Sequence, residues 1–182
     1  YMKKTLSDFL SNPTKENFSS LQKEIFEDPN YNPYSSDVNK IQDFYDDDEL
    51  EKAVEYESIN TLLSPRAHLF KSYALREMNM HERAQSEKAF ALKILKGISL
   101  TGDGTEEKPY IVTRISDERD MLDYFEEEYQ GQGLISHEDR TLDLMICQSG
   151  REIYFDITRP FLRLSELMDS DKRNEPDSEN DE

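Results

Sequence analysis

Two short segments with alternating apolar residues constrain the fold of this chain most. The apolar residues occupy every second position: Leu142, Leu144 and Ile146 in the first segment, and Ile153, Phe155 and Ile157 in the second. Such alternation is typical of β-strands that bury one face. The linking residues Gln148-Ser149-Gly150-Arg151 suit a tight turn. The sequence therefore predicts two antiparallel strands, each with one buried face.

Residues 1–100 carry apolar residues at helical spacing and are predicted to form a helical region. A helix is expected after Asn12-Pro13, because Asn suits the cap and Pro suits the first turn. Another is expected through Val38 and Ile41, and a third after the acidic run 46–49, whose carboxylates suit a helix N-terminus. Ser64-Pro65 should begin a helix to about residue 78. A short turn then leads into a helix over 82–98, which Gly97 helps to end, and this pair predicts an antiparallel helical hairpin.

Residues 101–168 read as a small α/β module. After the turn cluster 101–105, the β-branched and aromatic segment 110–115 predicts a strand. Ser116 should cap a helix whose apolar stripe extends to Tyr129, and the glycines of 131–133 indicate a loop before the hairpin. Residues 169–182 contain seven acidic, two basic and no apolar residues, which predicts a disordered tail. The expected fold class is α+β, with a helical N-terminal half packed on a C-terminal β-α-β-β module.

The net negative charge of the chain limits the kinds of macromolecule that it can bind. The chain has 40 acidic and 22 basic residues, for a formal net charge of −18. Such a field repels phosphate, so nucleic acids and anionic membranes are poor partners, and a basic protein is a better one. Most of the carboxylates are expected to be solvated. No segment approaches the roughly 20 apolar residues that cross a bilayer.

The first residues carry no apolar run typical of a signal peptide. If Met2 is the true start, a cytoplasmic location is expected. If the chain is a processed form, a periplasmic or exported one is expected.

No catalytic, cofactor-binding or metal-binding residues are expected. The three histidines, His68, His81 and His137, fall in separate predicted elements, and the adjacent triplet 137–139 is poorly arranged to chelate one ion. Cys147 is the only cysteine, and its position in a predicted strand indicates a buried, unreactive thiol. Gly102-Asp103-Gly104 follows a helix and carries an acid, so it does not resemble a phosphate-binding loop.

Tyrosines are the residues most indicative of an interaction surface. Four of them lie in the helical half: Tyr31, Tyr34, Tyr45 and Tyr56. Tyrosine is amphipathic and enriched at protein interfaces. It is equally common at the edge of a core with its hydroxyl in water, so both interpretations stay open.

Several motifs occur in an order that resembles a known bacterial family. These are the loop Tyr31-Asn32-Pro33-Tyr34, the helical hairpin 65–97, the turn 102–104, Gly131-Gln132 and the closing Tyr154-Phe155-Asp156-Ile157. Together they resemble the uncharacterised family called domain of unknown function 4919, over about residues 28–167. The resemblance implies tetratricopeptide-like helices followed by a small α/β module, and it implies no activity. Glu77 and Lys93 depart from the tetratricopeptide pattern, and no second copy of the repeat is visible.

Three functions follow as hypotheses. The first is a non-catalytic protein-interaction module with an acidic helical half. The second is an enzyme or small-ligand-binding protein with a site between the two halves, where such sites are common. The third is a neutraliser of a basic toxin, which the net charge permits.

Overall fold

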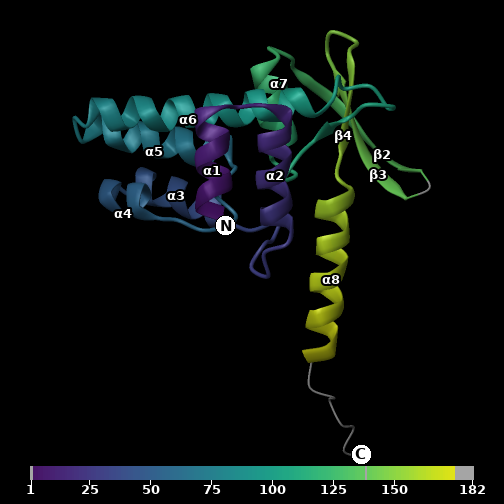
Figure 1. Cartoon of the computed structure of the whole chain (residues 1–182), viewed down its shortest axis with the longest axis horizontal. Coiled ribbons are helices and arrows are strands. Elements are labelled where there is room, and N and C mark those ends of the chain that lie inside the picture. The colour runs from purple at the N-terminus through teal and green to yellow at the C-terminus, as the bar shows by residue number, and fades with distance from the viewer. Residues whose placement is uncertain (1, 138, 175–182) are drawn as a thin grey trace, which may run out of the picture.

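The computed structural model describes residues 2–137 and 139–174 and has an α+β fold (Figure 1). Helices make up the N-terminal half: α1 (Met2–Ser11), α2 (Lys15–Phe26), α3 (Asp37–Asp46), α4 (Leu50–Glu55), α5 (Pro65–Glu77) and α6 (His81–Thr101). The C-terminal part contains β1 (Tyr110–Ile111), α7 (Asp117–Tyr124), β2 (Tyr129–His137), β3 (Arg140–Cys147), β4 (Glu152–Asp156) and α8 (Thr158–Asn174). This arrangement confirms the expected fold class.

The helical hairpin of α5 and α6 forms as the sequence predicts. The Ser64 hydroxyl accepts a hydrogen bond from the Ala67 amide at 3.3 Å, and Pro65 occupies the first turn, where no amide donor is needed. Helix α6 does not end near Gly97 but continues to Thr101. Gly97 is buried inside α6, because the Phe18 ring of α2 packs directly on its backbone. The glycine therefore permits a close helix contact instead of ending the helix.

Four strands form one mixed sheet in the order β1-β4-β3-β2. Strands β3 and β4 are antiparallel and place Asp143 opposite Phe155 and Met145 opposite Ile153, which confirms the predicted hairpin. β1 runs parallel to β4 at one edge. The core face of β3 carries Met145 and Cys147, and the acidic Asp143 lies on that same face.

Several elements differ from the sequence-based expectations. Helix α1 was not expected, and Thr14, not Asn12, caps α2 by accepting a hydrogen bond from the Asn17 amide at 3.2 Å. The acidic run 46–49 ends α3 and turns the chain, with Asp48 in the left-handed region, before α4 begins. The expected loop 131–133 lies inside strand β2, and the helix expected to reach Tyr129 ends at Tyr124.

Helix α8 is the largest departure from the expected organisation. It extends to Asn174, so the prediction of a disordered tail is wrong for residues 169–174. Residues 175–182 lie outside the described part of the chain. Figure 1 shows α8 leaving the sheet and projecting away from the rest of the molecule.

The main core joins the helical half to the sheet. It contains residues from α1, α2, α6, α7 and the sheet, among them Phe9, Phe18, Ile94, Met121 and Phe155. A second, smaller core lies among α3, α4 and α5. Because one continuous core includes residues of both halves, the two predicted halves form a single packed unit.

Gly97→Ala is expected to lower the free energy of unfolding by about 1–3 kcal/mol, because the added methyl group would meet the ring of fully buried Phe18. Chemical denaturation monitored by circular dichroism measures this loss. Gly133→Ala is the matched control, since nothing lies within 4 Å of the position that its methyl group would take. Equal stability of the two variants would contradict the close packing of α2 on α6.

Candidate functional site

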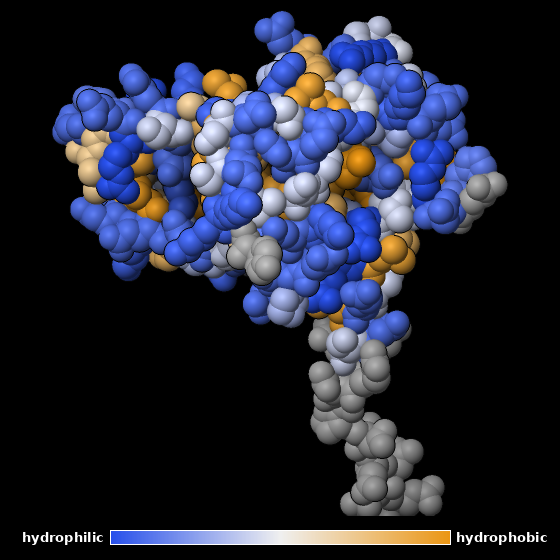
Figure 2. Space-filling model, viewed as in Figure 1, coloured by the Kyte–Doolittle hydropathy of each residue, from blue (hydrophilic) through white to orange (hydrophobic). Residues whose placement is uncertain are grey.

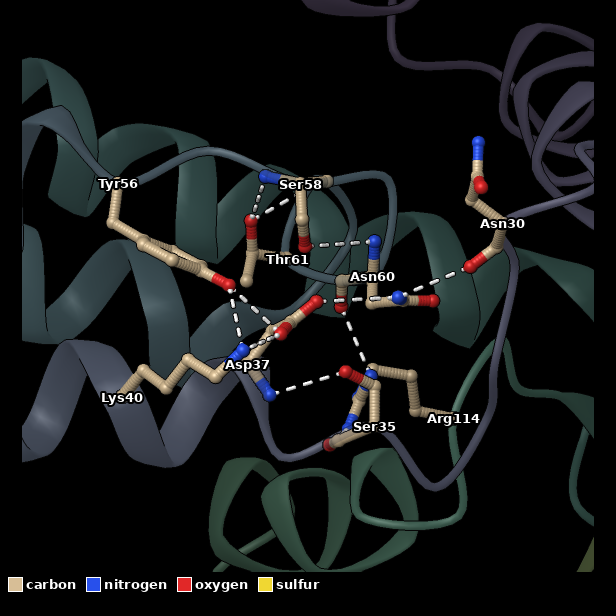
Figure 3. Close-up of polar contacts among 9 residues, drawn as sticks. All are labelled: Asn30, Ser35, Asp37, Lys40, Tyr56, Ser58, Asn60, Thr61 and Arg114. Atoms are coloured by element: carbon tan, nitrogen blue, oxygen red, sulfur yellow. Dashed lines mark hydrogen bonds and ion pairs between the residues drawn. The ribbon is translucent and has the colours of Figure 1, made fainter.

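A buried arginine connects the two halves of the molecule (Figure 3). Arg114, in the segment between β1 and α7, donates to the Asn60 carbonyl oxygen at 3.0 Å and to the Ser35 carbonyl oxygen at 2.7 Å. Both acceptors belong to loops of the helical half. Nearby, Gln22 and Tyr31 donate to the backbone carbonyl oxygens of Ile111 and Thr113, respectively. The segment 111–114 is therefore held from several sides.

Asp37 is the anionic centre of the same network. Its carboxylate accepts hydrogen bonds from Tyr56 at 2.8 Å, from Lys40 at 3.0 Å and from Asn60 at 3.2 Å. Burial alone would raise the pKa of Asp37, but the hydrogen bonds from Ser58, Lys40 and the other donors hold it well below the ordinary value. Because the charge already has several donors, this network is suited to fixing the loops 30–36 and 57–62, not to binding a ligand.

A cluster of carboxyl groups is buried between α7 and the sheet. Asp117 and Glu118 have no exposed surface, and Asp143 of β3 is 4% exposed. One oxygen of Asp117 accepts from the amides of Thr113 and Arg114 at 3.2 and 2.9 Å, while its other oxygen has no donor. The expectation that carboxylates are solvated is wrong for these residues, because they occupy the core-facing sides of α7 and β3.

Burial and mutual repulsion raise the pKa values of this acid cluster. Burial, the charge of Asp143 and that of Asp117 raise the pKa of Glu118 to about 9. Burial and the charge of Asp120 raise the pKa of Asp117 to about 7. Carboxyl groups with raised pKa values are a feature of general acid–base catalysis. Here Asp117 and Glu118 have no exposed surface, so a substrate cannot reach them in this structure.

A second group of polar residues lines a cleft of about 520 Å³ inside the helical half. His68 of α5 has Glu87 of α6 at 2.6 Å from Nδ1 and the Leu62 carbonyl oxygen at 2.9 Å from Nε2. Both ring nitrogens of His68 therefore lie at hydrogen-bond distance from an oxygen of the protein. Burial would raise the pKa of Glu87, but the hydrogen bond and charge of His68 lower it. His68 therefore has no free nitrogen to act as a catalytic base.

A further cleft, of about 490 Å³, lies where the sequence-based alternative placed a ligand site, between α2 and the start of α8. Its rim carries groups of both signs, including Arg140, Asp156 and Arg159. Arg140 donates to the Glu106 carbonyl oxygen, and Asp156 accepts from the Thr158 amide at 2.9 Å. Arg159 lies over the Phe26 ring at 5.7 Å. Each of these three charged groups already contacts another part of the protein, so none of them is free to act on a substrate in this cleft.

The four tyrosines do not form one surface. Tyr31 lies in the core, with its hydroxyl donating to the Thr113 carbonyl oxygen at 2.7 Å, and Tyr56 belongs to the Asp37 network. Tyr45 lines a depression with Tyr73 and donates to Glu77. Tyr34 is 51% exposed, and it lies near enough to the acid cluster for those charges to raise its pKa, together with burial. Tyr34 and Tyr45 remain candidates for contact with a partner.

Cys147 is fully buried on the core face of β3. Burial and the charge of Glu127 raise the pKa of its thiol, which agrees with an unreactive cysteine. Within residues 2–137 and 139–174, no three His, Cys, Asp or Glu side chains are placed to hold a metal ion. In the same part of the chain, no helix combines the length and apolar character needed to span a bilayer.

Sequence reasoning missed the most exposed apolar element. Helix α8 carries Phe161, Leu164, Leu167 and Met168 at helical spacing, and Met168 is 52% exposed. The sequence does contain the feature that predicts this helix: these apolar residues occupy positions i, i+3, i+6 and i+7, directly before the acidic end of the chain. Figure 2 shows hydrophobic surface where α8 leaves the body of an otherwise mainly hydrophilic molecule.

No protein-family model, curated protein or solved structure matches this chain. The resemblance to domain of unknown function 4919 stays a prediction from the sequence.

The acid cluster predicts that stability falls as pH rises. Glu118 has a folded-state pKa of about 9 and an ordinary value of 4.5, so the folded protein holds an extra proton between these values. The free energy of unfolding should decrease from about pH 5 to about pH 9, by up to roughly 1.4 kcal/mol per pH unit for each such proton. Glu118→Gln should reduce this slope and be more stable than the wild type at the alkaline end. Urea denaturation across the range measures both effects.

Glu128→Gln is the control for loss of one negative charge, because Glu128 is exposed. It should keep the slope of the wild type. A wild-type stability that is constant over this range would show that Glu118 ionises without cost in the folded state. Asp37 does not interfere, since its lowered pKa affects stability only in more acidic solution.

Proposed function

We propose that this protein is a non-catalytic protein-interaction module that presents helix α8 to its partner. The observation that carries this proposal is the projection of α8 from the body (Figure 1), with the apolar residues Phe161, Leu162 and Met168 exposed on it. An unpartnered amphipathic helix is a common means of docking into an apolar groove of another protein.

The base of α8 is firmly attached, which supports its use as a rigid docking element. Arg163 donates to the Tyr31 carbonyl oxygen at 2.9 Å and to the Pro29 carbonyl oxygen at 2.6 Å. The Thr158 hydroxyl accepts from the Thr141 amide at 3.0 Å. These contacts fix the first turns, so the exposed part of the helix needs little further ordering on binding, which lowers the entropic cost.

The charge of the chain favours a basic partner. Five acidic residues follow α8 in the sequence: Glu175, Asp177, Glu179, Asp181 and Glu182. The net charge of −18 adds long-range attraction to a cationic surface. The proposed partner is a protein whose apolar groove is bordered by Lys or Arg residues. A basic toxin is one protein of that class.

The geometry favours binding over catalysis. The carboxyl groups of Glu118 and Asp143 are closed to solvent, and both nitrogens of His68 are occupied. The Cys147 thiol is buried and its pKa is raised. None of these groups is presented to a substrate in the described structure.

Replacing apolar residues of α8 should abolish partner binding without unfolding the protein. Immobilised wild-type protein and the double variant Leu162→Glu/Met168→Glu, which changes residues that are 53% and 52% exposed, would be treated with lysate of the native host at low salt, and retained proteins identified by mass spectrometry. We expect a basic protein that the wild type retains and the variant loses, and whose retention falls as salt is added.

Leu92→Glu is the matched control, because Leu92 is 49% exposed on α6, away from α8. It should retain the same protein as the wild type. A partner retained equally by the α8 variant would contradict the proposal. Light scattering that shows α8-dependent dimers of the wild type would instead make a second copy of this chain the occupant.

A further inference from the structure

The cleft beside His68 has a mainly apolar lining. Leu6 of α1, Ile59 and Leu62 of the loop 57–62, and Phe90 of α6 contribute side chains to it. Its volume of about 520 Å³ lies within the range of small-molecule sites. The loop wall is fixed on its other side by the Arg114 network, because Asn60 in this loop binds both Arg114 and Asp37. The cleft is therefore a preformed space and not a gap beside a mobile loop.

Glu87 already has a partner inside the cleft. Its carboxylate lies 2.6 Å from Nδ1 of His68, and the Phe90 ring packs on His68 with a centroid separation of 4.0 Å. Lys71 is then the buried residue of the cleft whose charge has no bonded partner within residues 2–137 and 139–174.

Lys71 of α5 lines the same cleft and is only 5% exposed. No hydrogen bond or ion pair reaches its ammonium group from residues 2–137 and 139–174. Burial lowers the pKa of Lys71, and the charges of Glu87 and Glu57 offset this only in part. The side chain of Lys71 is thus enclosed by protein while its ammonium group has no bonded protein partner, and a carboxylate is the natural counterion for such a group.

We infer that this cleft binds a small monocarboxylate with an apolar body, whose carboxylate pairs with Lys71 and whose chain lies against Leu62 and Phe90. This site differs from the α8 surface and does not depend on it. The neighbouring acids oppose binding of a second negative charge. Asp28 and Glu57 lie on the cleft wall and Glu87 lies within it, so a dicarboxylate should bind less well than a monocarboxylate.

Calorimetric titration of the full chain with decanoate below its micellar concentration tests the inference. We expect saturable binding to one site, with affinity weakened at least about tenfold by Lys71→Met, which removes the ammonium and keeps an apolar side chain. Lys88→Met, at an exposed position of α6, should bind decanoate as the wild type does. Decylamine, which has a similar chain and the opposite charge, should bind more weakly than decanoate.

Two further measurements make the result decisive. Lys71→Met should be at least as stable as the wild type, because it replaces an unpaired buried charge, so lost binding would not reflect unfolding. Nuclear Overhauser contacts should connect the decanoate chain to Leu62 and Phe90. Unchanged affinity in Lys71→Met, stronger binding of decylamine, or no saturable binding of decanoate would each overturn the inference.

Discussion

The buried guanidinium of Arg114 is the interaction on which the arrangement of the two halves depends. It comes from the C-terminal part and binds backbone carbonyl oxygens of two loops in the helical half. One of these loops carries Asn60, which also holds Asp37, so the network extends from the sheet side to α3. Removing one partner of such a network would leave buried polar groups unpaired, a large cost in a small protein.

The acid cluster shows how a strongly acidic chain can place carboxyl groups in its interior. Asp117 and Glu118 follow Arg114 by three and four residues, and Asp143 lies on the core face of β3. Burial raises the pKa values of these groups and so favours their neutral forms, and Glu118, with a pKa of about 9, is a neutral acid near neutral pH, which lowers the cost of its burial. The cost returns as they ionise, and this links the stability of the protein to pH.

The buried titratable groups and the exposed apolar residues of α8 lie in different parts of the molecule. The buried acids with raised pKa values have no access to solvent, whereas α8 exposes Phe161, Leu162 and Met168 just before the acidic end of the sequence. The Lys71 cleft lies in the helical half, and no described residue of α8 lines it. Binding of a partner through α8 and of a small ligand in the cleft therefore involve different residues.

Local patterns determined the α+β class, the α5–α6 hairpin and the β3–β4 hairpin, because periodicity, Ser64-Pro65 capping and turn residues act within a few positions. They could not determine which face of β3 meets the core, since that depends on what packs there: the side bearing Asp143, Met145 and Cys147 faces α7. Glycines in β2 resembled a loop until pairing with β3 made a strand. The burial of Glu118 and Lys71 and the exposure of α8 were likewise decided by tertiary contacts, because solvation depends on neighbours distant in sequence.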